Sequence, residues 1–252
     1  MTNNSQVINK QFKYPDGSYI SYRQIKGSSP GIFYMHGSQS SIDSTKALFV
    51  ENYCKENGIG FTSFNFTGHG DSSGKYTDGT ISIWLRDALA VMDNLTSGDQ
   101  IVIGSSLGGW IMLLLAMRRP DRVKGMIGLA AAPDFTVWLW EALPQDMRDK
   151  LLQDGIIYTP SEYSEEGEPW TLELIQDGNN NLVLNHPITT DAKVILFQGD
   201  KDDCVPVDVP LKIKDRLTSK EVRVIILKGG KHNLSEPHEL LYLQNAIKEI
   251  VL

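Results

Sequence analysis

Short apolar runs alternate with helical stretches along most of this chain, and this alternation constrains the fold more than any other feature. The runs are almost continuously apolar, which is typical of strands buried on both faces of a sheet. The expected strands cover residues 31–35, 60–66, 100–104, 123–131, 192–199 and 221–227, and the expected helices cover residues 43–57, 80–95, 107–118, 208–218 and 237–251. Two shorter strands around the turn Pro15-Asp16-Gly17 predict an antiparallel start. The sequence therefore predicts an α/β fold with a mostly parallel sheet and helices on both faces.

One interval interrupts this alternation, between Pro133 and Asp191. It spans about sixty residues without an obvious strand, and a segment of that size in a compact domain is usually a functional insertion. At 252 residues the chain is predicted to be a single domain, residues 1–252, with a cap inserted at about residues 134–190. Trp138 and Trp140 of this cap are candidate substrate-binding residues, which either line an acyl channel or pack the cap onto the domain.

The stretch Gly104-Ser105-Ser106-Leu107-Gly108 is the first motif that carries chemistry. It fits the pattern G-x-S-x-G only with Ser106 at the centre, because Ser105 would need glycines at positions 103 and 107. A strand is expected just before it and a helix just after it, which is the context of a nucleophile elbow. A glycine turn that carries hydroxyls by chance is the alternative, and the elbow is favoured by this context.

A serine hydroxyl needs a neighbouring base to react at neutral pH. The chain has five histidines, and His232 is the candidate base because it follows the last expected strand and precedes the last helix. The sequence around the other four predicts structural, pocket-rim or surface positions. These are His36, His69, His186 and His238.

The base needs a carboxylate that orients it. Asp202 is the preferred candidate, since Gly199, Asp202, Val205 and Pro206 fit the pattern G-x-x-D-x-x-V-P after the penultimate strand. Asp134, which follows the preceding strand, is the rival. The chain order Ser106, Asp202, His232 is the nucleophile–acid–base order of an α/β-hydrolase.

Backbone amides complete the expected site. The N–H groups of Ser38 and Leu107 are the candidate oxyanion hole, since one follows a strand and the other begins the helix after Ser106. The expected reaction is acyl transfer to water through an acyl-enzyme. It requires no metal and no cofactor.

Charge and composition exclude several other classes of partner. With 24 basic and 31 acidic residues the formal net charge is −7, which argues against a nucleic-acid partner. The longest apolar run, roughly Trp110 to Met117, is too short to span a bilayer. Cys54 and Cys204 match no metal-binding spacing and are expected to be reduced, and the first residues show no leader. These features predict a cytoplasmic protein.

Six stretches of the chain carry a more specific resemblance. They are HGSQSSIDSTKALFVENYCKENG, TGHGDSSGKYTDGTISIWLRDALAVMDNL, VIGSSLGGWIMLLLAMRRPDRV, PSEYSEEG, HPI and KDDCVP. Together they resemble the family of mitochondrial palmitoyl-protein thioesterases, also described as mycophenolic acid acyl-glucuronide esterases, and their bacterial relatives. The resemblance runs from about Gly31 to the C-terminal helix and implies an α/β-hydrolase fold with small-molecule or protein-linked acyl ester or thioester substrates. It also implies that Ser106 is the nucleophile, Asp202 the acid and His232 the base.

Two residues depart from the pattern of these relatives. Asn65 stands where such folds often have Asp, which concerns a loop-anchoring hydrogen bond and not the catalysis. Ser38 stands where relatives tend to have a bulkier residue, so the shape of the acyl pocket is expected to differ. The mitochondrial location is not carried over, because no transit peptide is visible.

The fold and the motif leave other functions open. A serine peptidase or a C–C bond hydrolase uses the same fold, since fold does not determine the substrate. A catalytically silent binding module is a further alternative, although such proteins usually lack a member of the triad. An enzyme that cleaves acyl esters or thioesters is the preferred interpretation.

Overall fold

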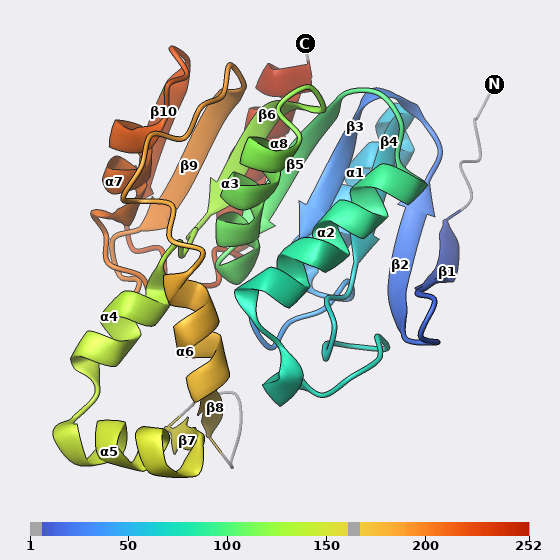
Figure 1. Cartoon of the computed structure of the whole chain (residues 1–252). Coiled ribbons are helices and arrows are strands. Elements are labelled where there is room, and N and C mark those ends of the chain that lie inside the picture. The colour runs from blue at the N-terminus through green and yellow to red at the C-terminus, as the bar shows by residue number, and fades with distance from the viewer. Residues whose placement is uncertain (1–6, 161–166, 252) are drawn as a thin grey trace.

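The computed structural model describes residues 7–160 and 167–251, and its main element is an eight-stranded sheet (Figure 1). The strand order is β1-β2-β4-β3-β5-β6-β9-β10, and all pairs from β4 to β10 are parallel. The antiparallel strands β1 and β2 form one edge. The strands are β1 (Ile8–Lys13), β2 (Tyr19–Ile25), β3 (Ser28–Met35), β4 (Ile59–Phe64), β5 (Gln100–Ser105), β6 (Val123–Leu129), β9 (Lys193–Gly199) and β10 (Val222–Leu227). The predicted fold class is confirmed.

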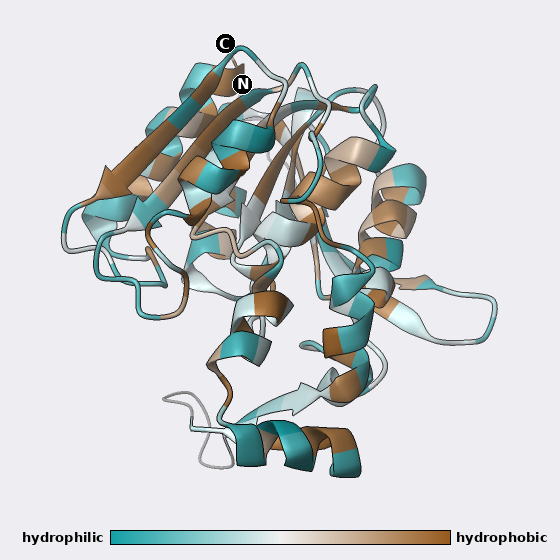
Figure 2. Cartoon of the chain, turned by 60° about the vertical axis from the view of Figure 1, so that its left-hand side comes forward, coloured by the Kyte–Doolittle hydropathy of each residue, from teal (hydrophilic) through white to brown (hydrophobic). Residues whose placement is uncertain are grey.

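Helices cover both faces of the sheet and enclose a separate apolar core on each side (Figure 1). One face carries α1 (Thr45–Asn57) and α8 (Pro237–Val251). The other carries α2 (Ile81–Leu95), α3 (Leu107–Arg118) and α7 (Val209–Arg216). In Figure 2 several strands of the sheet are brown over much of their length, and the helices carry both hydrophobic and hydrophilic residues. Several expected boundaries shift by a few residues. For example, α1 begins at residue 45 after a turn, and β4 ends at residue 64, where the chain leaves the sheet.

The segment between β6 and β9 lies at the carboxyl-terminal edge of the sheet (Figure 1). It contains α4 (Phe135–Ala142), α5 (Gln145–Asp154), β7 (Ile156–Thr159), β8 (Glu168–Thr171) and α6 (Leu172–Asn179). The expectation of an interval without strands is wrong, because β7 and β8 pair antiparallel. The sequences of β7 (IIYT) and β8 (EPWT) lack the strict alternation of apolar and polar residues that identifies a strand. Most of the stretch PSEYSEEG lies outside the described residues.

An aromatic row joins this segment to helix α3. The ring of Phe135 lies edge-on to that of Trp110, with centroids 5.3 Å apart, and 5.8 Å from that of Trp170. The indole of Trp110 also donates a hydrogen bond of 3.1 Å to the carbonyl of Asn181. Trp110 is therefore a fully buried core residue that packs against the segment between β6 and β9.

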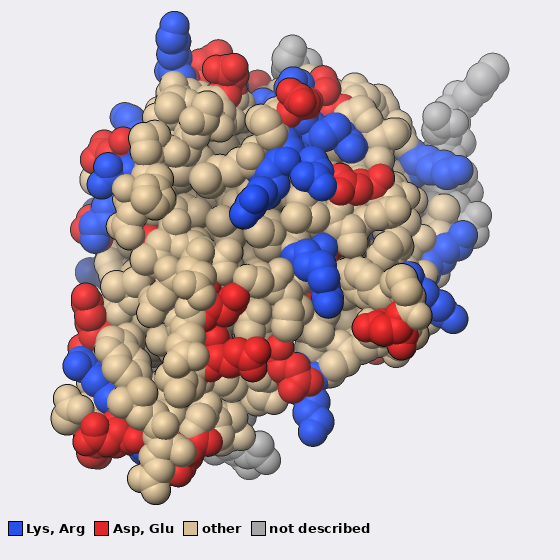
Figure 3. Space-filling model, in the orientation of Figure 1, with Lys and Arg blue, Asp and Glu red and all other residues tan. Residues whose placement is uncertain are grey.

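Charges on the surface are mixed. On the face drawn in Figure 3, acidic and basic side chains stand among one another. Within residues 7–160 and 167–251, each helix is too short or too polar to span a bilayer.

A buried carboxylate ties the loop after β4 to helix α2. Asp87 is fully buried, and its oxygens accept hydrogen bonds from the Tyr14 hydroxyl (2.9 Å) and from the Thr67 amide (2.7 Å). Arg86 lies 2.9 Å from the same carboxylate. Burial and the Asp87 carboxylate raise the pKa of the Tyr14 hydroxyl, so it remains a hydrogen-bond donor. The helix thereby holds the N-terminal strands and this loop together.

We expect Asp87→Ala to lower the free energy of unfolding by about 2–3 kcal/mol, because it leaves the partly buried Tyr14 hydroxyl and Thr67 amide without their acceptor. Asp93→Ala on the same helix removes an exposed pair with Arg119 and should cost no more than about 1 kcal/mol. Urea unfolding of both variants measures the difference. Equal losses would contradict the anchoring role of Asp87.

Candidate active site

Ser106 occupies the turn between β5 and α3 and adopts φ 51°, ψ −117°. This conformation is strained for a residue with a side chain, and neighbouring backbone must hold it. The Ser106 amide donates to the carbonyl of Leu129 (2.9 Å), and its own carbonyl accepts from the amides of Gly109 (2.8 Å) and Ala132 (3.1 Å). The turn is thus fastened to the end of β6 and to α3.

The glycines of the motif are required by close backbone contacts. A Cβ on Gly104 would lie 2.3 Å from the carbonyl oxygen of Gly108. A Cβ on Gly108 would lie 2.5 Å from the carbonyl oxygen of Met35 at the end of β3. The two glycines therefore let strand, turn and helix approach closely enough to present Ser106 at the sheet edge.

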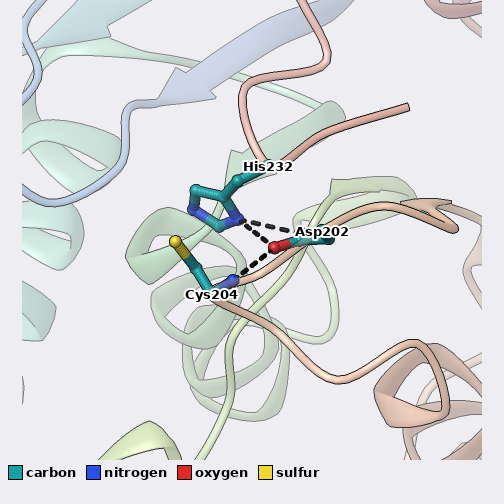
Figure 4. A group of neighbouring side chains, drawn as sticks. All are labelled: Asp202, Cys204 and His232. Carbon is teal, nitrogen blue, oxygen red and sulfur yellow. Dashed lines mark hydrogen bonds and ion pairs between the residues drawn. The ribbon is translucent and has the colours of Figure 1, made fainter. Parts of the chain in front are cut away.

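The structure brings His232 and Asp202 to this serine from two distant loops. His232 Nε2 lies 3.0 Å from Ser106 Oγ, and His232 Nδ1 lies 3.0 and 3.2 Å from the two carboxylate oxygens of Asp202. The Asp202 side chain is fully buried, whereas that of His232 is 18% exposed. With Nδ1–H donating to Asp202, the lone pair of Nε2 faces the serine hydroxyl. Figure 4 shows the contact between Asp202 and His232.

Asp202 is held as a charged acceptor. Burial raises the pKa of Asp202. The hydrogen bond and charge of His232 and the amides of Cys204 and Val205 lower it by more, so the net shift of the pKa is downward. Both amides donate to Oδ1 at 2.9 Å, and the Gln198 side chain donates to Oδ2 at 2.7 Å. The carboxylate therefore remains ionised beside the imidazole.

The rival acid, Asp134, has a different environment. It begins α4 with φ 59°, and its two carboxylate oxygens accept hydrogen bonds from the amides of Val183 and Leu184, each at 2.9 Å. These bonds fasten the start of the segment between β6 and β9 to its end. The structure thus brings Asp202, and not Asp134, to His232.

The candidate oxyanion donors Ser38 and Leu107 both line the cavity at Ser106. Among the described residues, neither backbone amide donates to a backbone carbonyl. A Cβ on Gly37 would lie 3.1 Å from that of Ser106, so the loop after β3 runs directly beside the serine. The Ser38 hydroxyl also shares a short hydrogen bond with the Tyr76 hydroxyl, and this bond helps to hold the loop after β3 in place.

A cavity of about 520 Å³ opens at the serine, within the range of roughly 300–1,000 Å³ that is usual for small-molecule sites. Its apolar wall comes from the segment between β6 and β9 and from the loop after β9. The residues of this wall are Phe135, Trp138, Leu139, Ala142, Trp170 and Val205.

The two tryptophans expected at the substrate lie differently. Trp138 lines the cavity, but Trp140 does not. The ring of Trp140 instead lies under the guanidinium of Arg148, at 5.7 Å. Residues two apart on a helix do not share a face, so Trp140 is corrected to a packing residue.

Several cavity residues were missed by the sequence analysis. Trp170 is held by a hydrogen bond from its indole to the Thr159 hydroxyl (2.9 Å). Burial raises the pKa of Glu168 and lowers that of Lys46 to about 8. The ammonium of Lys46 donates to the carbonyl of Asn233, next to the candidate base. No local motif marks these residues, because each reaches the cavity from a distant element.

Within the described part of the chain, the remaining histidines do not line the cavity at the serine. His36 and His69 are buried with ring centroids 5.0 Å apart, whereas His186 and His238 are exposed. His36 Nδ1 bonds the carbonyl of Gly37 at 2.7 Å, which supports the loop that carries Ser38. Burial lowers the pKa of His36 to about 3 and that of His69 to about 4.

Asn65 provides its own loop anchor where related folds often have Asp. Its side-chain oxygen accepts from the amide of Ile42 (2.9 Å), and its nitrogen donates to the Ser21 hydroxyl (2.9 Å). The loop between β3 and α1 is therefore fastened by the amide itself.

Comparison with known proteins identifies the family. The model of the α/β-hydrolase fold family matches residues 36–166, more than half of the chain. Human palmitoyl-protein thioesterase ABHD10, a mitochondrial protein, is 35% identical over 94% of this chain and 78% of its own length. The chain belongs to the α/β-hydrolase family.

Solved structures agree with this assignment. Alpha/beta hydrolase domain-containing protein 10 from mouse superposes with a TM-score of 0.91 at 33% identity, covering 97% of this chain and 98% of its own. A putative hydrolase from Agrobacterium vitis S4 gives the same TM-score and identity over 98% and 99% of the two chains. The predicted α/β-hydrolase class and the resemblance to the palmitoyl-protein thioesterase family are confirmed.

The prediction of a cytoplasmic location is wrong. The curated relatives from human, Pongo abelii and Bos taurus are named as mitochondrial proteins. The prediction relied in part on free cysteines, and both are indeed unpaired. A free thiol indicates a reducing compartment without saying which one.

The buried neutral histidines predict an acid-sensitive fold. In the unfolded chain a histidine binds its proton near pH 6.5, whereas His36 and His69 bind theirs only near pH 3 and 4 when folded. The contribution of these two histidines to the free energy of unfolding is therefore fully present above about pH 6.5. It is lost as the pH falls towards 4, by up to about 1.4 kcal/mol per pH unit for each histidine.

We expect His69→Phe to make this loss shallower, since phenylalanine keeps the ring packing against Tyr76 and Trp84 and takes up no proton. Unfolding by urea at a series of pH values between 7 and about 4 measures the slope. The exposed His186→Phe is the control and should leave the slope as it is. An unchanged slope in His69→Phe would show that His69 does not contribute.

Proposed function

We propose that this protein is a serine hydrolase that cleaves acyl esters or thioesters through Ser106, His232 and Asp202. The observation that carries the proposal is the continuous row of hydrogen bonds from Ser106 Oγ through the His232 ring to Asp202 at the floor of an apolar cavity. The proposal includes a single domain in which residues 134–190 act as a cap over that cavity.

The first half of the reaction forms an acyl-enzyme. The Ser106 hydroxyl attacks the carbonyl carbon of the substrate while His232 Nε2 accepts the hydroxyl proton over a distance of 3.0 Å. Asp202 keeps the Nδ1–H tautomer and stabilises the imidazolium that forms. The imidazolium then gives its proton to the departing thiol or alcohol.

The developing oxyanion is stabilised by the amides of Ser38 and Leu107. Leu107 is the first residue of α3, so its amide has no partner within the helix and the positive end of the helix dipole adds to its effect. One such donor is worth roughly 3–4 kcal/mol of barrier. In the second half of the reaction, water that loses its proton to His232 releases the acid.

The cavity favours an apolar acyl group. Aromatic and aliphatic side chains of the proposed cap form one wall, and burial contributes roughly 0.8 kcal/mol for each methylene of a bound chain. The relatives named palmitoyl-protein thioesterase agree with a long acyl chain on a thioester. We therefore propose medium- to long-chain acyl thioesters or esters as substrates, with no metal or cofactor required by the mechanism.

We expect Ser106→Ala to abolish labelling by a fluorophosphonate probe and to lower kcat by about 10⁴-fold or more. Ser105→Ala is the matched control, because it removes the neighbouring hydroxyl of the same turn. Hydrolysis of acyl esters, acyl thioesters and aminoacyl amides is then compared for the wild-type enzyme. Labelling that survives Ser106→Ala would refute the nucleophile. Amide cleavage without esterase activity favours a peptidase, and a folded protein that stays unlabelled favours a binding module.

Trp138 and Trp140 offer a matched test of the acyl site. We expect Trp138→Ala to raise KM for long-chain substrates more than for acetyl substrates, since the lost ring lines the cavity. Trp140→Ala removes an equal volume from the same helix outside the cavity and should leave the chain-length profile unchanged. The profile over acyl lengths, measured as kcat/KM, decides. Identical profiles for both variants would contradict an acyl chain beside Trp138.

A further inference from the structure

A thiol lies beside the proposed acid–base pair, and the hydrolysis mechanism does not use it. Cys204 is on the loop after β9, two residues beyond Asp202, and its exposed side chain lines the cavity. One ligand atom from each of Asp202, Cys204 and His232 lies within 4.8 Å of the other two. Figure 4 shows the sulfur next to the His232 ring, with the Asp202 carboxylate on the other side of the loop's backbone amide.

The distances within this group suit a small tetrahedral ion. Two nitrogen or oxygen ligands that bind Zn²⁺ at about 2.0–2.2 Å lie roughly 3.3 Å apart in a tetrahedral site. His232 Nδ1 lies 3.0 and 3.2 Å from the Asp202 oxygens. The sulfur lies no more than 4.8 Å from the other two ligand atoms, and it must leave its hydrogen bond to Asp203 and move closer to bind the same ion.

The loop already holds one of the three ligands, the Asp202 carboxylate, in place. The amides of Cys204 and Val205 fix Oδ1 of Asp202, and the Gln198 side chain fixes Oδ2. Hydrogen bonds of this kind orient metal-binding carboxylates and raise their affinity. Cys204 and His232 line the cavity, so an ion can approach the group from that side.

The donor set selects the ion. Thiolate and imidazole ligands favour Zn²⁺ and similar thiophilic cations over Mg²⁺ or Ca²⁺. A carboxylate, a thiolate and a neutral imidazole balance the two charges of Zn²⁺. The thiol proton is released to solvent when the Zn–S bond forms, so one proton leaves for each ion bound.

An ion at this place is incompatible with hydrolysis. A neutral imidazole that binds Zn²⁺ through Nδ1 carries its hydrogen on Nε2, which then has no lone pair for the Ser106 proton. The serine then loses its base.

We propose that Asp202, Cys204 and His232 form an inhibitory site for a thiophilic divalent cation of the Zn²⁺ type. The inhibitory consequence rests on the proposed function, whereas the binding of the ion does not. Cys204 is the residue that would make this hydrolase sensitive to such ions, because the other two ligands alone are a weaker and harder set.

The binding is tested without reference to activity. Metal-free protein is titrated with Cd²⁺, and the ultraviolet absorbance of the cadmium–thiolate bond is followed. We expect an absorbance that saturates at one Cd²⁺ ion per chain and disappears when added Zn²⁺ displaces the Cd²⁺. Cys204→Ser should show no such absorbance. Cys54→Ala removes the other, buried cysteine and should keep the full signal.

The inhibition is tested on hydrolysis of an acyl ester. Each variant is compared with its own metal-free rate, so that a direct effect of the substitution on catalysis cancels. We expect Zn²⁺ to inhibit the wild-type enzyme and Cys54→Ala alike, with recovery on addition of EDTA. Cys204→Ser should need a Zn²⁺ concentration about tenfold or more higher for half inhibition.

The two measurements separate the possible failures. An active enzyme without a Cys204-dependent cadmium signal, or with equal Zn²⁺ sensitivity in Cys204→Ser, overturns the ion site. A protein that binds Cd²⁺ through Cys204 but hydrolyses neither acyl esters nor acyl thioesters supports the site and refutes the proposed function instead.

Discussion

Ser106 adopts a left-handed backbone conformation, with φ 51° and ψ −117°, that costs free energy and persists only where its surroundings enforce it. Here the enforcement comes from the ends of β5 and β6, from the first turn of α3 and from the loop after β3. Gly104 and Gly108 allow these backbones to touch, at distances that no Cβ would permit. The rest of the proposed site is arranged around the position that this turn gives to one hydroxyl.

The parallel sheet explains how residues 126 positions apart in sequence meet at that hydroxyl. The carboxyl ends of parallel strands lie at one edge, so the loops after β5, β9 and β10 converge there. Asp200 reinforces this convergence, since its carboxylate accepts a hydrogen bond of 2.6 Å from the amide of Gly229, at the start of the loop that carries His232. The proposed acid and base are thereby held on neighbouring loops whose spacing does not depend on a substrate.

The segment between β6 and β9 supplies what the sheet lacks, an apolar wall. Its connection to the domain is twofold: Asp134 bonds the two ends of the segment to each other, and the aromatic row of Trp110, Phe135 and Trp170 packs it onto α3. The helix that follows the strained turn is thus also the support of the cavity wall. The same aromatic row includes Phe135 and Trp170, which line the cavity.

The sequence by itself determined the sheet, its order of strands and helices, and the three residues that chain order and spacing pointed to. Ser106, Asp202 and His232 are recognisable because each lies in a short motif directly after a strand, and the period of apolar residues locates the strands. Local patterns carry no information about which side chains from distant elements share a cavity. Only the tertiary structure separated Trp138 from Trp140, paired β7 with β8, and brought Glu168, Lys46 and Cys204 to the same site. These outcomes depend on long-range packing, in which the face that a residue presents is decided by the element it packs against.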